Sequence, residues 1–230
     1  MHQSSLKHQL FAEFFGTAAL LCAVIGSGIM AVNLSSGNDG IALLANTLAT
    51  VFALYVLIEL LGPVSGAHFN PVVTLIVLFR ASNTAVSQQN QVQKAIFYIA
   101  FQLAGAAAGA WLANAMFDLS VLQFSSKVRG GWGQWLGEIV ATAGLILVVL
   151  RAPAGKAAGL VACYIGAAYW FTSSTSFANP AAVMGRMLSD SFAGIAPNHA
   201  LAFVAAQSVG AVLGVVLNHQ LGATSPPSQN

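Results

Sequence analysis

Long stretches without any charged side chain are the feature of this sequence that most limits its fold. Only 14 of the 230 residues are Asp, Glu, Lys or Arg, whereas about a quarter of a soluble domain is charged. A bilayer crossing needs about 20 mostly apolar residues. Five charge-free windows approach or exceed that length: 14–38, 40–58, 95–117, 157–185 and 191–230. We therefore expect a protein of the lipid bilayer, and not a disordered chain, a nucleic-acid binder or an ordinary cytosolic enzyme.

The apolar windows predict an all-α membrane protein with six transmembrane helices and two re-entrant half-helices. We place the spans at 11–32, 41–61, 95–116, 133–151, 157–175 and 199–219. Two further apolar segments, 66–79 and 173–188, are too short or too broken to cross. Short interrupted segments at matching places in two halves are typical of helices that enter the membrane halfway. The membrane domain is then 11–219, between a cytoplasmic stretch 1–10 and a disordered tail 220–230.

The basic residues predict the orientation. With the amino terminus inside, five of them fall on cytoplasmic connections, which the positive-inside rule favours: Lys7, Arg80, Lys94, Arg151 and Lys156. Lys127 and Arg129 fall on the other side, beside Asp118. Both termini are therefore expected in the cytoplasm.

Three motifs occur twice, in the same order. The pairs are Glu13-x-x-x-Thr17 and Glu138-x-x-x-Thr142, Asn70-Pro71-Val72 and Asn179-Pro180-Ala181, and Gln102-x-x-Gly105-Ala106-x-x-Gly109 and Gln207-x-x-Gly210-Ala211-x-x-Gly214. Each half, about 11–116 and 133–219, holds three spans, an odd number. The second half must therefore enter from the opposite face, which gives an inverted repeat.

The two Asn-Pro motifs predict half-helix starts that meet near the bilayer midplane. Pro is favoured at the first helical position and Asn as the cap before it. Each start carries about half a positive charge from the aligned peptide dipoles. A cation is repelled there, whereas water can accept hydrogen bonds from the amides of Asn70 and Asn179, which interrupts a proton wire.

The segments before each motif are expected to line the path with backbone carbonyls, because irregular backbone at membrane depth must be buried or face water. These residues are Gly66, Ala67, His68 and Phe69 in the first half, and Ser174, Thr175, Ser176 and Phe177 in the second. Glu13 and Glu138 lie deep within spans. We expect each to accept backbone N–H bonds from its own re-entrant loop; a proton relay is the alternative.

The segment 65–74, Ser-Gly-Ala-His-Phe-Asn-Pro-Val-Val-Thr, resembles the first motif of the major intrinsic protein family of aquaporins and aquaglyceroporins, with Val72 where Ala is usual. The resemblance covers roughly 11–219. It implies one pore per subunit, a homotetramer and, in a bacterium, the inner membrane.

In the family an Arg follows the second Asn-Pro-Ala and belongs to a four-residue selectivity filter. Here that position is Ala182, and counting from the motifs without gaps places the other filter positions at Thr50, Ala167 and Ser176. All four side chains are small, which predicts a wide filter. Arg186 lies one turn further, about 6 Å along the helix, and is expected either to replace the charge from the outer vestibule or to be solvated or paired with Asp190.

We therefore expect a passive channel for water and small uncharged solutes such as glycerol, urea or undissociated metalloid acids. Arsenous acid is included among these solutes because segments 26–30, 41–50 and 179–195 resemble a bacterial subgroup associated with arsenite. The alternatives are an ion-coupled secondary transporter, a strictly water-selective channel and a junction protein with a closed pore. No catalytic site, metal site or cofactor is expected, since Cys22, Cys163 and the five His are scattered.

Overall fold

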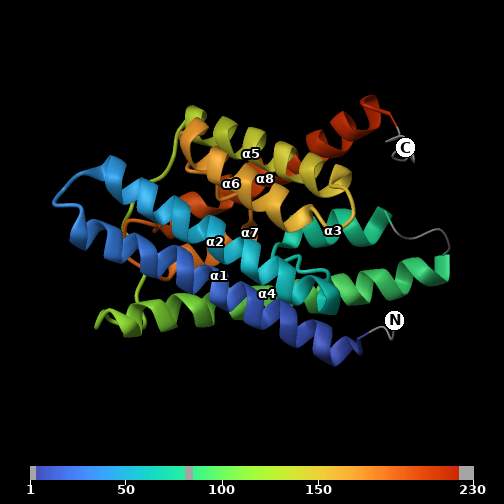
Figure 1. Cartoon of the computed structure of the whole chain (residues 1–230), viewed down its shortest axis with the longest axis horizontal. Helices are drawn as coiled ribbons and strands as arrows, with labels where there is room; N and C mark the ends of the chain where they lie inside the picture. The colour runs from blue at the N-terminus through green and yellow to red at the C-terminus, as the bar shows by residue number, and fades with distance from the viewer. Residues whose placement is uncertain (1–3, 81–84, 223–230) are drawn as a thin grey trace.

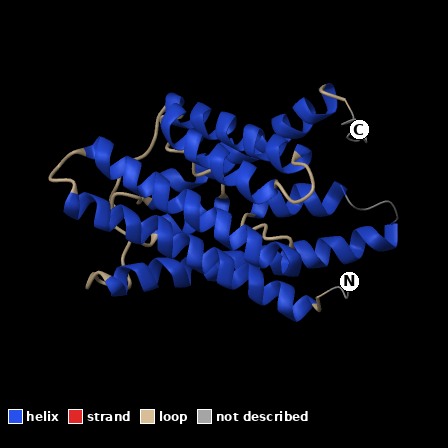
Figure 2. Ribbon diagram, viewed as in Figure 1, coloured by secondary structure: helices blue, strands red, loops and turns tan. Residues whose placement is uncertain are grey.

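The protein is a bundle of helices in a computed structural model that describes residues 4–80 and 85–222. Over these residues the expected all-α class is confirmed, with no strand (Figure 2). The helices are α1 (Leu6–Leu34), α2 (Asp39–Ser65), α3 (Pro71–Arg80), α4 (Ala85–Met116), α5 (Trp132–Arg151), α6 (Ala157–Phe171), α7 (Pro180–Met187) and α8 (Pro197–Gln220). The predicted disordered tail lies almost entirely outside the described residues.

The helix ends differ from the predicted spans because hydropathy marks the part of a helix that suits lipid and not where the helix stops. α1 begins at Leu6 and α4 at Ala85, ahead of the predicted 11 and 95. α6 ends at Phe171, four residues before the predicted 175. Among the described helices, α1, α2, α4, α5 and α8 are long and apolar enough to cross a membrane, while α6 is a shorter apolar helix of 15 residues.

The helices form two matching halves, α1–α4 and α5–α8 (Figure 1). α1 packs along α4, α5 packs along α8 in the same way, and α2 meets α6 between the halves. The start of α1 and the end of α8 lie at one end of the bundle, which we call the termini end. The α4–α5 connection lies at the opposite, far end.

The two short helices begin in the middle of the bundle and run in opposite directions. α3 extends toward the termini end (Figure 1). α7 runs to the far end, where the carbonyl of Met187 accepts a hydrogen bond from the N–H of Ser125, in the α4–α5 connection, at 2.8 Å. This opposite polarity is the arrangement expected of an inverted repeat.

Glycines allow the paired helices of each half to touch at their backbones. A Cβ atom on any of four glycines would overlap a carbonyl oxygen of the partner helix: Gly105 faces Phe14, Gly109 faces Ala18, Gly210 faces Ile139 and Gly214 faces Ala143. These are the glycines of the third repeated motif, so the repetition in sequence corresponds to the same helix crossing built twice.

In the first half, the carboxylate of Glu13 holds the loop between α2 and α3. It accepts hydrogen bonds from the N–H groups of His68 at 3.0 Å and Phe69 at 2.8 Å. It also accepts from Ser65 Oγ at 2.6 Å and from Gln102 Nε2 at 2.7 Å. Glu13 has no exposed surface, so a buried carboxylate and buried amide donors satisfy one another.

In the second half, Glu138 holds the loop between α6 and α7 through three of the four corresponding hydrogen bonds, without one like that of Ser65 to Glu13. Its carboxylate accepts from the N–H groups of Phe177 at 2.8 Å and Ala178 at 2.9 Å, and from Gln207 Nε2 at 2.6 Å. Glu138 is also fully buried. Both carboxylates therefore lie against their own loops, as the structural interpretation of the sequence requires.

These loops adopt an unfavourable backbone conformation. Six of their residues have positive φ: Gly66 (94°), Ala67 (50°), Phe69 (49°), Thr175 (62°), Ser176 (47°) and Ala178 (47°). The positions match between the halves. For residues other than glycine the left-handed region costs about 1–2 kcal/mol each, and the hydrogen bonds to Glu13 and Glu138 offset that cost.

The helix crossing predicts that Gly210→Ala destabilises the fold. The added methyl group would overlap the carbonyl oxygen of Ile139, and overpacking of this kind costs about 1–3 kcal/mol. Thermal unfolding in detergent measures the loss. Gly62→Ala is the matched control, because its Cβ would meet no atom within 4 Å; an equal loss in both variants would contradict the crossing.

The loop contacts predict that Glu138→Ala frees the second re-entrant loop. The N–H groups of Phe177 and Ala178 lose their acceptor, which costs about 1–3 kcal/mol for each buried donor. Hydrogen exchange of these two amides should accelerate strongly. Glu59→Ala removes an exposed carboxylate instead and should leave both amides protected; unchanged exchange in Glu138→Ala would show that the loop holds itself.

Candidate functional site

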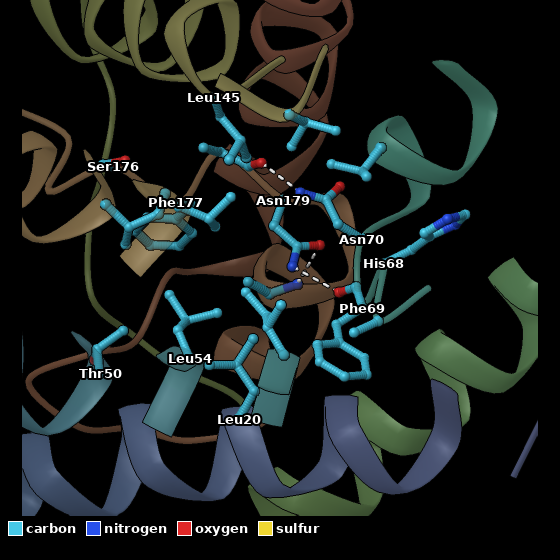
Figure 3. A pocket seen from close by; sticks show the side chains of 18 of the residues that line it. Leu20, Thr50, Leu54, His68, Phe69, Asn70, Leu145, Ser176, Phe177 and Asn179 are labelled. Atoms are coloured by element: carbon cyan, nitrogen blue, oxygen red, sulfur yellow. Dashed lines mark hydrogen bonds between the residues drawn. The ribbon is translucent and has the colours of Figure 1, made fainter. Parts of the chain in front are cut away.

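A cavity of about 320 Å³ lies between the two halves, beside the starts of α3 and α7 (Figure 3). Aliphatic side chains form much of its wall: Leu20, Leu54, Val73, Leu145, Val149 and Ile165. Polar groups reach it at two levels. The amides of Asn70 and Asn179 are at the middle, and Thr50, Tyr169, Ser176 and Arg186 also line it.

The two asparagines bind each other's loops. Asn70 Nδ2 donates to the carbonyl of Ala178, and Asn179 Nδ2 donates to the carbonyl of Phe69, both at 2.8 Å (Figure 3). Their side-chain oxygens accept from helix N–H groups, Val72 for Asn70 and Ala181 for Asn179. The oxygens are thus occupied, and each NH₂ keeps a second hydrogen with no acceptor among the described residues.

Of the six residues predicted at the midplane, the two asparagines line the cavity. Pro71, Val72, Pro180 and Ala181, the first two residues of α3 and of α7, do not line it. Their backbone sets the direction of the asparagine amides.

Six of the eight loop residues expected to line the path line the cavity. They are residues 66–69 in the first loop and Ser176 and Phe177 in the second, where Ala178 joins them; Ser174 and Thr175 do not line it. The carbonyl of Ser174 is instead bonded by Arg129 Nη1 at 3.3 Å. A contact from the α4–α5 connection therefore draws this part of the loop away from the cavity.

Three of the four predicted filter residues, Thr50, Ser176 and Ala182, line the cavity. Ala167 does not: it is exposed, and the face of α6 that lines the cavity carries Val161, Ile165 and Tyr169. Ala167 is two residues from both Ile165 and Tyr169, which places it on the opposite side of the helix. These three lining side chains are four residues apart, which puts them on one face of the helix. That spacing would have indicated the lining face, whereas counting back from Asn179 did not.

Tyr169 brings a hydroxyl to Thr50. The two oxygens are 3.3 Å apart. Thr50 Oγ1 already donates its only hydrogen to the carbonyl of Asn46 at 2.8 Å, so the Tyr169 hydroxyl donates to Thr50. The side chains around Thr50 therefore include a tyrosine as well as the small residues.

Arg186 also lines the cavity and is 2% exposed. Its Nε donates to the carbonyl of Ala193, and its Cζ lies 3.3 Å from the ring centroid of Phe177. Asp190 accepts hydrogen bonds from Ser126 instead. Arg186 is thus enclosed by the protein and is not paired with Asp190.

Two further cations lie beside it, on the α4–α5 connection, where the sequence suggested only an orientation signal. Arg129 is 7% exposed and donates to the carbonyls of Gly194, Ser174 and Phe192. Burial lowers the pKa of Arg129 to about 10. Burial, and then the charges of Arg129 and Arg186, lower the pKa of Lys127 to about 8.

The comparisons with known proteins agree with this geometry. The family described as Major intrinsic protein matches residues 1–173. The chain is 46% identical over 220 residues to Aquaglyceroporin AqpS of Rhizobium meliloti, covering 94% of this chain and 91% of that protein. Aquaporin-5 of Mus musculus is 38% identical over 128 residues, 53% of this chain and 44% of that protein.

A solved structure has the same fold. The X-ray structure of the aquaglyceroporin from Plasmodium falciparum aligns with a TM-score of 0.63 at 21% identity, over 95% of this chain and 98% of that one. The family matches most of the length of this chain, and the structure has paired half-helices with asparagine amides at their starts. The chain therefore belongs to the major intrinsic protein family.

Proposed function

We propose that this integral membrane protein is a passive channel for water and small uncharged solutes that excludes cations and protons. Its family and its relatives support a channel for water and small solutes. The exclusion of cations and protons is supported by the cavity, in which two asparagine amides supply free N–H donors between aliphatic walls.

Charge exclusion follows from the middle of the cavity. The positive ends of the α3 and α7 dipoles meet there, and a cation finds no carboxylate among the residues that line it. A water oxygen that accepts from both asparagines points its hydrogens outward, which disfavours a continuous proton wire. Neutral molecules with oxygen acceptors can replace that water.

The solutes follow from the polar groups of the filter. Arg186 offers donors, Tyr169 has an acceptor oxygen, and the Ser176 hydroxyl can do both. Glycerol, urea and undissociated metalloid acids such as arsenous acid present matching hydroxyl or amide groups. The Rhizobium relative is named an aquaglyceroporin, which supports solutes beyond water.

An ion-coupled transporter would need carboxylates at the solute site. Neither Glu13 nor Glu138 lines the cavity, and both carboxylates are bonded to their loops. The position of both carboxylates away from the cavity favours the channel over the transporter.

The setting in the cell is also a proposal. The termini end is cytoplasmic, which follows from the basic residues, and four copies assemble in the bacterial inner membrane. Protease access to a carboxyl-terminal tag in inverted vesicles tests the orientation, and native mass spectrometry tests the tetramer. A protected tag or a monomer would contradict the respective statement.

Flux through proteoliposomes tests the function. We expect stopped-flow light scattering to show accelerated movement of water, glycerol, urea and arsenous acid, with no saturation and no effect of an ionophore. Water flux alone would favour the strictly water-selective channel. Saturable uptake that an ionophore abolishes would favour the transporter, and no osmotic permeability would favour the closed pore.

The position of the filter predicts opposite results for two residues of α6. Tyr169→Ala removes the large side chain from the cavity wall and should raise the permeability ratio of glycerol to water severalfold, because the constriction widens. Ala167→Phe, on the exposed face, should leave both permeabilities unchanged. If Ala167→Phe blocked the pore, Ala167 would belong to the filter, as counting back from Asn179 without gaps had placed it.

A further inference from the structure

Three cationic side chains converge at the far end of the cavity. Arg186 lines the cavity there, and the guanidinium carbons of Arg186 and Arg129 lie 3.3 Å and 5.1 Å from the ring centroid of Phe177. Lys127 lies within electrostatic range of both arginines. Phe177 itself is fixed by its N–H bond to Glu138.

No carboxylate among the described residues forms an ion pair with these cations. Arg129 and Lys127 donate to backbone carbonyls, Asp190 is bonded to Ser126, and Glu138 is occupied by its loop. The charge of Asp39 acts on Lys127 and that of Glu138 acts on both arginines, in each case without an ion-pair contact. The far end therefore holds an excess of positive charge at low exposure, where water screens it poorly.

Some of the donors in this region have no acceptor. Only the Nε of Arg186 finds a partner among the described residues, so its two Nη groups are free on a side chain that is 2% exposed and lines the cavity. The Ser176 hydroxyl, also 2% exposed and lining the cavity, has no hydrogen-bond partner. Both groups therefore present donors to the cavity that no protein acceptor occupies, so an acceptor that enters the cavity can bind them.

We propose that the far end of the cavity is a binding site for a small oxyanion, which occupies the Nη groups of Arg186 and the hydroxyl of Ser176 and thereby blocks solute entry. The planar guanidinium suits two oxygens of a carboxylate or phosphate at once. Lys127 and Arg129 attract the anion without touching it. The aliphatic wall beyond stops it from passing, because a charge without hydration or partner is costly there.

The proposed block of solute entry rests on the proposed channel function, whereas the proposed anion binding does not. Binding is tested on the purified protein in detergent with inorganic phosphate as the probe, against chloride at equal ionic strength. A ligand that binds the folded state raises the melting temperature. We expect phosphate to raise it in a saturable way and chloride to leave it unchanged.

Three variants assign the binding to this site. Arg186→Gln should weaken phosphate binding at least roughly tenfold, since it removes charge-assisted hydrogen bonds. Lys127→Met, which keeps the direct contacts, should weaken it by roughly twofold to fivefold. Arg151→Gln, whose guanidinium bonds the carbonyl of Gly222 in an exposed contact, is the control and should match the unchanged chain. If Arg186→Gln does not fold, Ser176→Ala with Lys127→Met replaces it.

The block is tested by glycerol flux into proteoliposomes with phosphate outside. Phosphate should slow glycerol with the concentration dependence found for binding. An equal melting shift in the unchanged chain and in Arg186→Gln would overturn the site, and binding without slower flux would overturn the block. Phosphate binding that depends on Arg186 in a protein that passes no glycerol would instead overturn the proposed function and leave the site in place.

Discussion

Two buried carboxylates are the constraint on which the pore depends. Glu13 and Glu138 each accept hydrogen bonds from two successive backbone N–H groups. Those bonds hold residues other than glycine at positive φ, a conformation that an isolated loop would leave. Carbonyls can line the cavity only while the loops keep this shape. A carboxylate at membrane depth is costly without partners, and here its partners are the N–H groups of the loop whose shape turns backbone carbonyls toward the cavity.

The two halves line the cavity with the same arrangement of loop and half-helix, but the charged side chains beside it differ between the halves. Arg186 and Arg129 share Phe177 in the second half, and the corresponding residue of the first half, His68, bonds Thr74 and packs on Tyr98. The absence of an arginine at Ala182 is therefore not an absence of positive charge. That charge comes from one turn further along α7 and from the connection between the halves.

Much of this could be predicted from the sequence, because the informative patterns are local or repeated. Charge-free windows and the Asn-Pro pairs predicted the half-helices, and the paired motifs predicted the inverted halves. The rotation of α6 could not be obtained by counting from Asn179, since the loop between them bends through three residues at positive φ. The role of Arg129 depends on carbonyls 45 to 65 residues away, which no local pattern reports.

The reciprocal bonds of the asparagines have a consequence for biosynthesis. Asn70 and its acceptor Ala178 are 108 residues apart, and Asn179 and its acceptor Phe69 are 110 apart. A chain is made from its amino terminus at about 5–20 residues per second, so the first loop waits for several seconds before its counterpart exists. The reciprocal bonds in the middle of the cavity can form only after Asn179, nearly four-fifths of the way along the 230 residues, has been made. Until then Asn70 has no counterpart.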